Sequence, residues 1–151
     1  MPLFLYLWMS KEKNMEGKTT TVEKGKTAEE TAASWLKERG LDILDRNWRC
    51  HHLEVDIIAE GPMLSAETSH PLNTAQRFLH IVEVRSRADN SPIEPDLTVD
   101  NKKQKRLINA ADAYIRSHRI HLEAMFDIIG IQTSESETTI SFRPDAFRPD
   151  W

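Results

Sequence analysis

The amino-acid sequence predicts an α/β domain in which a mixed β-sheet is flanked by helices, in the order helix, strand, strand, strand, helix, strand. Two observations predict this class. Residues 28–39 and 101–117 have the capping residues and apolar spacing of helices. The segments between and after them are rich in β-branched and aromatic residues, which is typical of strands. A chain of 151 residues has the size of one domain with a single core.

The composition narrows the class of protein. Apolar and charged residues make up 39% and 29% of the chain, and no apolar run approaches the roughly 20 residues that a membrane helix needs. The single cysteine, Cys50, excludes an internal disulfide framework and is typical of a reducing compartment. We therefore expect a soluble, cytoplasmic protein with no membrane attachment.

The net charge of −4 excludes a surface that is basic throughout. Any binding of nucleic acid must therefore be local, because it depends on lysine and arginine neutralising phosphates. The richest local group, and our candidate nucleic-acid-binding set, is Lys102, Lys103, Lys105 and Arg106. A solvated helix face is the alternative interpretation of this group.

Three regions are expected along the chain: a flexible N-terminal extension (1–24), a folded domain (25–142) and a C-terminal tail (143–151). The apolar start "MPLFLYLWM" is short and has no cleavage site after it, so it is a poor signal peptide. Translation from Met9 or Met15 is a hypothesis for this region. The tail repeats "FRPD", and we expect it to dock its aromatic residues.

The first helix is expected over residues 28–39. Thr27 and Glu30 have the spacing of a capping box, and Gly40 favours a stop. Glu29 lies at the flank of the apolar face, whereas Glu30 points away from it. The apolar face consists of Ala28, Ala32, Trp35 and Leu36.

Two strands are expected next, "LDILDRNWRC" and "HHLEVDIIAE". In the second, regular alternation puts Glu54 and Asp56 on one face and Val55 and Ile57 on the other. Residues 60–76 are rich in Gly, Pro, Ser, Thr and Asn and are expected to form a long loop.

The third strand is expected in "RFLHIVEVRSR". One of its faces begins with Leu79 and Ile81 and ends with Glu83 and Arg85, so it starts apolar and ends ionic. The opposite face consists of Phe78, His80, Val82 and Val84.

The second helix is expected from an N-cap at Asp100 to about Ser117. Lys103 stands in the same helical row as Leu107, Ala111 and Tyr114, so it extends the core-facing stripe at the first turn. After the helix, "MFDIIGI" is expected to be a buried strand, and the sequence leaves open whether "TTISFR" adds another.

Acidic and basic residues converge where stability alone would not require them: Glu29 beside an apolar face, Asp56 and Glu83 in strands, and Lys103 on an apolar row. Carboxylates at strand ends suit a hard divalent cation such as Mg²⁺ or Mn²⁺. The alternative is a set of structural ion pairs, Glu83 with Arg85 and Asp56 with a neighbouring cation. Periodicity alone favours the ion pairs.

Five blocks, in order, resemble the YraN-like family of uncharacterised bacterial proteins. They are "GKTAEETAASWLKERGLDILDRNWRC", "LEVDIIAE", "LHIVEVRSR", "VDNKKQKRLINAADAYI" and "FDIIGI", and they cover about residues 25–131. The resemblance implies a restriction-endonuclease-like, or PD-(D/E)xK, core. It makes residues 25–142 a nuclease-like domain.

The resemblance also implies roles for individual residues. Glu29, Asp56 and Glu83 match the family's acidic positions and would be the metal ligands, with Asp56, Glu83 and Arg85 as the catalytic set. Lys103 matches the basic residue at the start of the second helix. Asp127 matches an aspartate that we expect to serve structure.

Two departures from the family pattern bear on the chemistry. Leu53 stands where the family usually has glycine, and Arg85 stands where it has lysine. Lysine can lose a proton and orient a water, whereas arginine remains charged and can only hold charge or phosphate. The arginine therefore argues for weak or lost activity.

These observations predict a cytoplasmic, endonuclease-like protein that binds DNA or RNA, with Mg²⁺- or Mn²⁺-dependent phosphodiester hydrolysis as the candidate activity. The alternative is a non-catalytic nucleic-acid-binding or protein-assembly module on a nuclease fold. A homo-oligomer or a protein partner would use residues 60–76 or the C-terminal tail, and residues 60–76 would otherwise close over the site.

Overall fold

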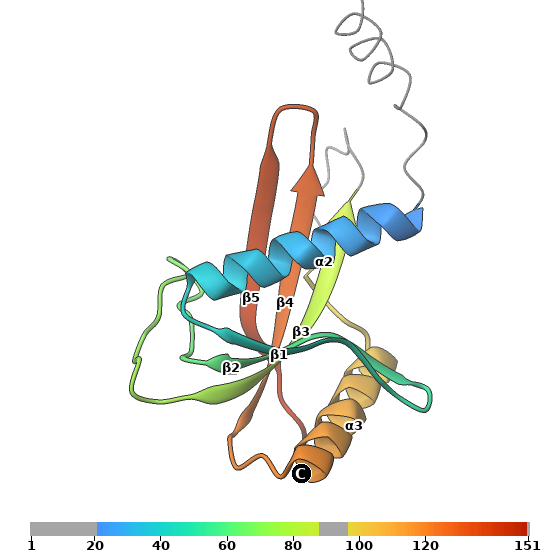
Figure 1. Cartoon of the computed structure of the whole chain (residues 1–151), viewed down its shortest axis with the longest axis vertical. Coiled ribbons are helices and arrows are strands. Elements are labelled where there is room, and N and C mark those ends of the chain that lie inside the picture. Colours follow the sequence, from blue (N-terminus) through green and yellow to red (C-terminus); the bar gives the residue numbers. More distant parts are fainter. Residues whose placement is uncertain (1–20, 88–96, 151) are drawn as a thin grey trace, which may run out of the picture.

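A computed structural model describes residues 21–87 and 97–150 (Figure 1). In chain order they form α2 (Thr21–Glu38), β1 (Asp42–Cys50), β2 (Leu53–Gly61), β3 (Phe78–Arg87), α3 (Asn101–His118), β4 (Ala124–Thr133) and β5 (Thr138–Phe147). This order confirms the predicted mixed α/β class and is consistent with a nuclease-like fold. Within the described ranges, neither helix is long and apolar enough to cross a membrane.

The five strands form one sheet in the order β1-β2-β3-β4-β5. Only β3 and β4 are parallel, and α3 makes the crossover between them. The other neighbouring pairs are antiparallel. Figure 1 shows α2 running across the sheet, while α3 lies near its lower end.

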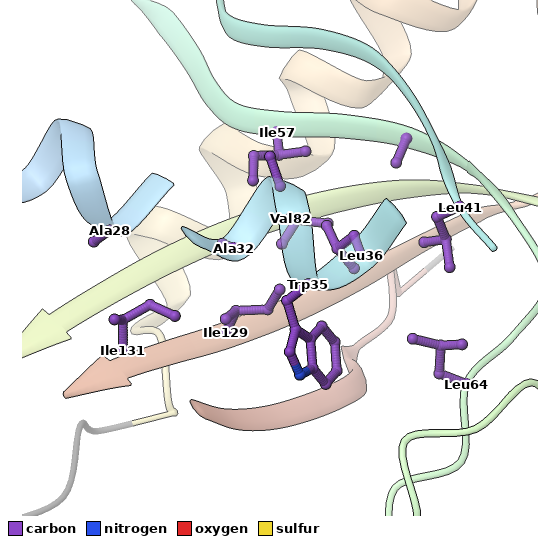
Figure 2. Packing of buried hydrophobic residues seen from close by; sticks show 12 residues of the cluster. Ala28, Ala32, Trp35, Leu36, Leu41, Ile57, Leu64, Val82, Ile129 and Ile131 are labelled. Atoms are coloured by element: carbon purple, nitrogen blue, oxygen red, sulfur yellow. The ribbon is translucent and has the colours of Figure 1, made fainter. Parts of the chain in front are cut away.

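The sheet separates two hydrophobic clusters. Leu36 of α2 packs with Val82 and Ile129, and Figure 2 shows it directed toward these strands. Leu107 of α3 packs with Ile81 on the opposite face. Burying a side chain such as Leu36 stabilises the fold by about 2 kcal/mol relative to leaving it in water.

Helix α2 begins earlier than the capping pattern predicts. Its first residue is Thr21, so Thr27 is inside the helix and not its N-cap, and Thr31 Oγ1 donates to the Thr27 carbonyl at 2.9 Å. The end is as predicted. Gly40 has a φ of 87°, and its N–H donates to the carbonyl of Lys37. The N–H of Leu41 donates to the carbonyl of Leu36. This bonding closes the last turn and favours glycine at residue 40.

Both ends of the chain bear on the expected regions. Residues 1–20 of the expected N-terminal extension lie outside the described residues, and residues 21–24 belong to α2. At the other end, β5 includes "TTISFR" and continues to Phe147, so residues 143–147 of the expected tail are strand. Phe147 stacks on Phe126 with ring centroids 4.9 Å apart, and Phe142 packs on Trp35. The expected docking of aromatic residues is thus confirmed for the two phenylalanines of the repeat, while Trp151 lies outside the described residues.

Helix α3 has the predicted N-cap. Asp100 accepts a hydrogen bond from the N–H of Lys103 at 2.8 Å. The predicted core row is also confirmed, because Leu107, Ala111 and Tyr114 are buried, and Tyr114 donates to Asp45 at 2.7 Å. Burial, followed by this bond to Asp45, raises the pKa of the Tyr114 phenol.

Candidate functional site

The candidate site lies where β2 and β3 separate. Their antiparallel pairing runs from Gly61 and Phe78 to Ile57 and Val82. Asp56 is the next residue of β2 beyond this last pair, toward the N-terminus. There its side chain, and not a backbone carbonyl of β2, accepts the hydrogen bond of β3: Asp56 Oδ2 accepts from the N–H of Val84 at 2.8 Å. This bond holds the Asp56 carboxylate between the two strands.

The alternation predicted for β2 is wrong at this point. Val55 packs in the α3 cluster, whereas Ile57 packs in the α2 cluster, although regular pleating would put them on the same face. The irregularity lies opposite Asn47 of β1, whose φ of 49° is left-handed. The two strands therefore change the direction of their side chains around Asp56.

Glu83 of β3 reaches the same place from the face that α3 covers. Its side chain is 10% exposed, and its Oε2 lies 3.3 Å from Lys103 Nζ. The Nε of Arg85 is 3.7 Å from Glu83 Oε1, a distance for an ion pair but not for a hydrogen bond. The predicted faces of β3 are thus confirmed, and Lys103 comes to the acid from another element.

The electrostatics of Asp56 show how closely the acids approach. The pKa of the Asp56 carboxyl is raised to about 7, chiefly by burial and then by the charges of Glu83 and Glu29, while the Val84 N–H and Lys103 act in the opposite direction. Glu83 and Glu29 therefore lie close enough to repel a charge on Asp56. A carboxyl whose pKa is raised by burial and by neighbouring acids is typical of functional sites.

The predicted metal ligands are only partly brought together. Glu29 is half-buried on α2, as expected, while Glu30 is exposed. Across the two described stretches, no group of three or more His, Cys, Asp or Glu side chains is arranged to hold a metal ion, and Cys50 is therefore not part of such a group. The set of three metal ligands stays a prediction.

The basic residues of α3 divide between two sides of the helix. Lys103 faces Glu83, whereas Lys105 lines a polar groove with Gln104 and Arg148. Lys102 and Arg106 are exposed. Lys102 and Arg106 lie between these two sides, because Lys102 is three residues from Lys105 and Arg106 is three residues from Lys103. The four cations therefore form one arc around the helix, and their binding to nucleic acid stays a prediction.

The long loop is attached at the far end of the strand pair. It leaves β2 after Gly61 and enters β3 at Phe78, five residues along the strand from Glu83. Leu64 anchors it by packing in the α2 cluster, and Leu72 is 63% exposed. This attachment gives no support to closure of the loop over Asp56 and Glu83.

The structure contains a second polar group, formed by His80 and Asp127, whose pairing was not predicted from the sequence. His80 Nδ1 lies 2.6 Å from Asp127 Oδ2, and both residues are buried. His80 Nε2 faces the carbonyl of Gly61 at 3.3 Å, and Asp127 Oδ1 accepts from the N–H of Asp145 at 2.8 Å. The group thus joins β2, β3, β4 and β5, in agreement with the structural role expected of Asp127. Two polar residues within apolar strands were the only signal.

The sequence model of the "Uncharacterised protein family UPF0102" matches residues 28–131. The chain is 34% identical over 123 residues to a UPF0102 protein of Parabacteroides distasonis, covering 82% of this chain and 90% of that protein. It is 35% identical over 127 residues to a UPF0102 protein of Bacteroides thetaiotaomicron, covering 84% and 93%.

The matched region includes every residue of the candidate site, from Glu29 to Lys103, and also Asp127. It agrees with the region over which the five sequence blocks resemble the YraN-like family. The match covers well over half of the chain and most of each relative. The chain therefore belongs to the uncharacterised protein family UPF0102, which is the YraN-like family.

Proposed function

We propose that this protein is a cytoplasmic, nucleic-acid-binding domain of endonuclease type, with Mg²⁺- or Mn²⁺-dependent hydrolysis of a phosphodiester as its activity. The observation that carries the proposal is the meeting of Asp56, Glu83 and Lys103 where β2 and β3 separate. Two acids and a cation at one end of a strand pair suit chemistry on a phosphate.

The residues present fit a hard divalent cation. Mg²⁺ and Mn²⁺ prefer oxygen ligands, and Asp56 and Glu83 would hold the ion, with Glu29 as the third candidate. The raised pKa of Asp56 supports this, because a cation would offset the repulsion that Glu83 and Glu29 exert on it. When bound, such an ion supplies polarisation of a phosphoryl oxygen and acidification of a water.

The protein's own residues supply binding and orientation. The Val84 N–H holds Oδ2 of Asp56, so Oδ1 is the oxygen that would bind a cation. The Lys103 ammonium lies 3.3 Å from Glu83 Oε2 and would neutralise a phosphate bound beside that acid. Lys102 and Arg106 extend the positive charge along the exposed part of α3, where a nucleic-acid backbone would lie.

A non-catalytic binding or assembly module is the second candidate. Two observations favour it: Glu83 is already paired with Lys103 and Arg85, and arginine at residue 85 cannot act as a base. For assembly, the loop of residues 60–76 presents the exposed Leu72. In this case the acids of the site would be structural partners of the cations.

Calorimetric titration with Mn²⁺ separates the candidates. We expect the native chain to bind and Glu83→Ala to lose binding, whereas Glu54→Ala retains it. Glu54 is the matched control because it lies on β2 and its ion pair with Arg49 is exposed. Absence of binding to all three proteins would exclude the metal-dependent mechanism.

Incubation with single-stranded, duplex and branched DNA and with RNA then tests the activity. Cleavage that needs Mn²⁺ and is lost in Glu83→Ala supports the endonuclease. Binding without cleavage supports the non-catalytic module, and neither binding nor cleavage leaves protein assembly as the function.

A further inference from the structure

The segment just before α3 is held by side chains from three different elements. The carbonyls of three successive residues, 97 to 99, each accept one side-chain hydrogen bond. The donors are Arg143 Nη1 of β5 to Leu97 (3.2 Å), Arg85 Nη2 of β3 to Thr98 (3.3 Å) and Gln104 Nε2 of α3 to Val99 (3.0 Å). Two strands and the helix therefore fix this short connection.

The connection continues into the first turn of α3. Val99 is buried, and Asp100 accepts twice from the helix: its side chain from the Lys103 N–H at 2.8 Å and its carbonyl from the Gln104 N–H at 2.9 Å. The position of Lys103 thus depends on where residues 97–100 are held. Its ammonium ends 3.3 Å from Glu83.

We propose that Arg143 and Arg85 are positioning residues that hold residues 97–100 and thereby set the Lys103 ammonium against Glu83. The inference rests on the proposed function, in which Lys103 neutralises the phosphate. Arg85 then acts through Lys103: its Nη2 reaches Thr98 while its Nε lies beside Glu83. Lys103 contributes to the site the lysine that β3 lacks.

This arrangement gives a physical reason for arginine at residue 85. The guanidinium is planar and presents donors in several fixed directions, so one side chain can face both Thr98 and Glu83. A lysine ammonium is a single point at the end of a flexible chain. Lysine at this position would keep the pairing with Glu83 or the bond to Thr98, but not both.

Hydrogen exchange of the metal-free full chain, measured by NMR, tests the inference. In Arg143→Ala we expect the amides of Lys103 and Gln104 to exchange about tenfold faster, the size expected for losing one hydrogen bond. Arg143→Lys, which keeps one donor, should restore most of the protection. Arg49→Ala is the matched control, because this exposed arginine lies on β1 and pairs with the exposed Glu54.

The side-chain ammonium of Lys103 provides a second readout, which depends on its contact with Glu83 and not on the overall stability of the fold. Its ¹⁵N signal, assigned with Lys103→Arg, should be present in the native chain and in the control Arg49→Ala. It should be lost in Glu83→Gln, in Arg143→Ala and in Arg85→Lys. The signal therefore reports whether the ammonium is held against the acid.

Unchanged amide exchange and an unchanged ammonium signal in Arg143→Ala would overturn the inference. Equal acceleration at Phe126 and Ile129 of β4 would overturn it too, because it would indicate general destabilisation. If the local effects appear but the native chain neither binds Mn²⁺ nor cleaves nucleic acid, the proposed function fails and the positioning role stands.

Discussion

Replacing Asp56 with asparagine should stabilise the metal-free protein at alkaline pH. Asparagine resembles the neutral carboxyl in shape, and its side-chain oxygen can still accept from the Val84 N–H. It cannot carry the charge that burial, Glu83 and Glu29 oppose. The substitution therefore removes a repulsion while keeping the bond between the strands.

The magnitude follows from the pKa. The pKa of Asp56 is about 7 in the folded chain and 3.8 in an unperturbed carboxyl such as that of the unfolded chain. Between pH 3.8 and about pH 7 the native state therefore binds more protons than the unfolded state. Stability is fully present below about pH 4 and falls as the pH rises through 7. At about 1.4 kcal/mol per pH unit, Asp56→Asn should gain about 4 kcal/mol at pH 8 and about 1 kcal/mol at pH 4.5.

Urea unfolding followed by tryptophan fluorescence measures both values. Glu54→Gln is the control, because this carboxylate is exposed on the same strand and should give little gain at either pH. The reasoning is refuted if Asp56→Asn is no more stable than the native chain at pH 8, or if its gain is the same at both pH values. Addition of Mn²⁺ at pH 8 should then stabilise the native chain and not Asp56→Asn.

Three further predictions concern other parts of the molecule. Asp127→Ala should lower the free energy of unfolding by about 3 kcal/mol in urea titrations, because it removes the buried carboxylate that pairs with His80. Asp112→Ala is the control, since this aspartate of α3 makes an exposed ion pair with Arg116 and its loss should cost little; equally small losses in the two variants would contradict the prediction. Leu36→Ala should cost about 3 kcal/mol by the same measurement, since the side chain is fully buried. Lys102→Ala with Arg106→Ala should lower the slope of log affinity for nucleic acid against log salt by about two, and Lys105→Ala should lower it by about one, because each removed cation would neutralise one phosphate; unchanged slopes would show that these side chains do not meet the ligand.

Patterns within short segments were enough to predict the order of the elements from α2 to β4, the N-cap of α3, the two faces of β3 and the family. These depend on neighbours within a few residues. The N-cap bond joins Asp100 to the N–H of Lys103, only three residues away, and the two faces of a strand follow from the alternation of successive side chains. Both features depend on local geometry alone. The limits of local reasoning show in α2, where the capping pattern at Thr27 did not mark the start of the helix.

The assembly of the site depends on contacts between segments that are far apart in the chain. The bond from the Val84 N–H to Asp56 spans 28 residues, and the bond from Arg143 to Leu97 spans 46. The end of β2–β3 pairing, the change of face between Val55 and Ile57 and the approach of Lys103 to Glu83 arise from such contacts. Because they form only when distant strands and a crossover helix pack together, no spacing within one segment encodes them.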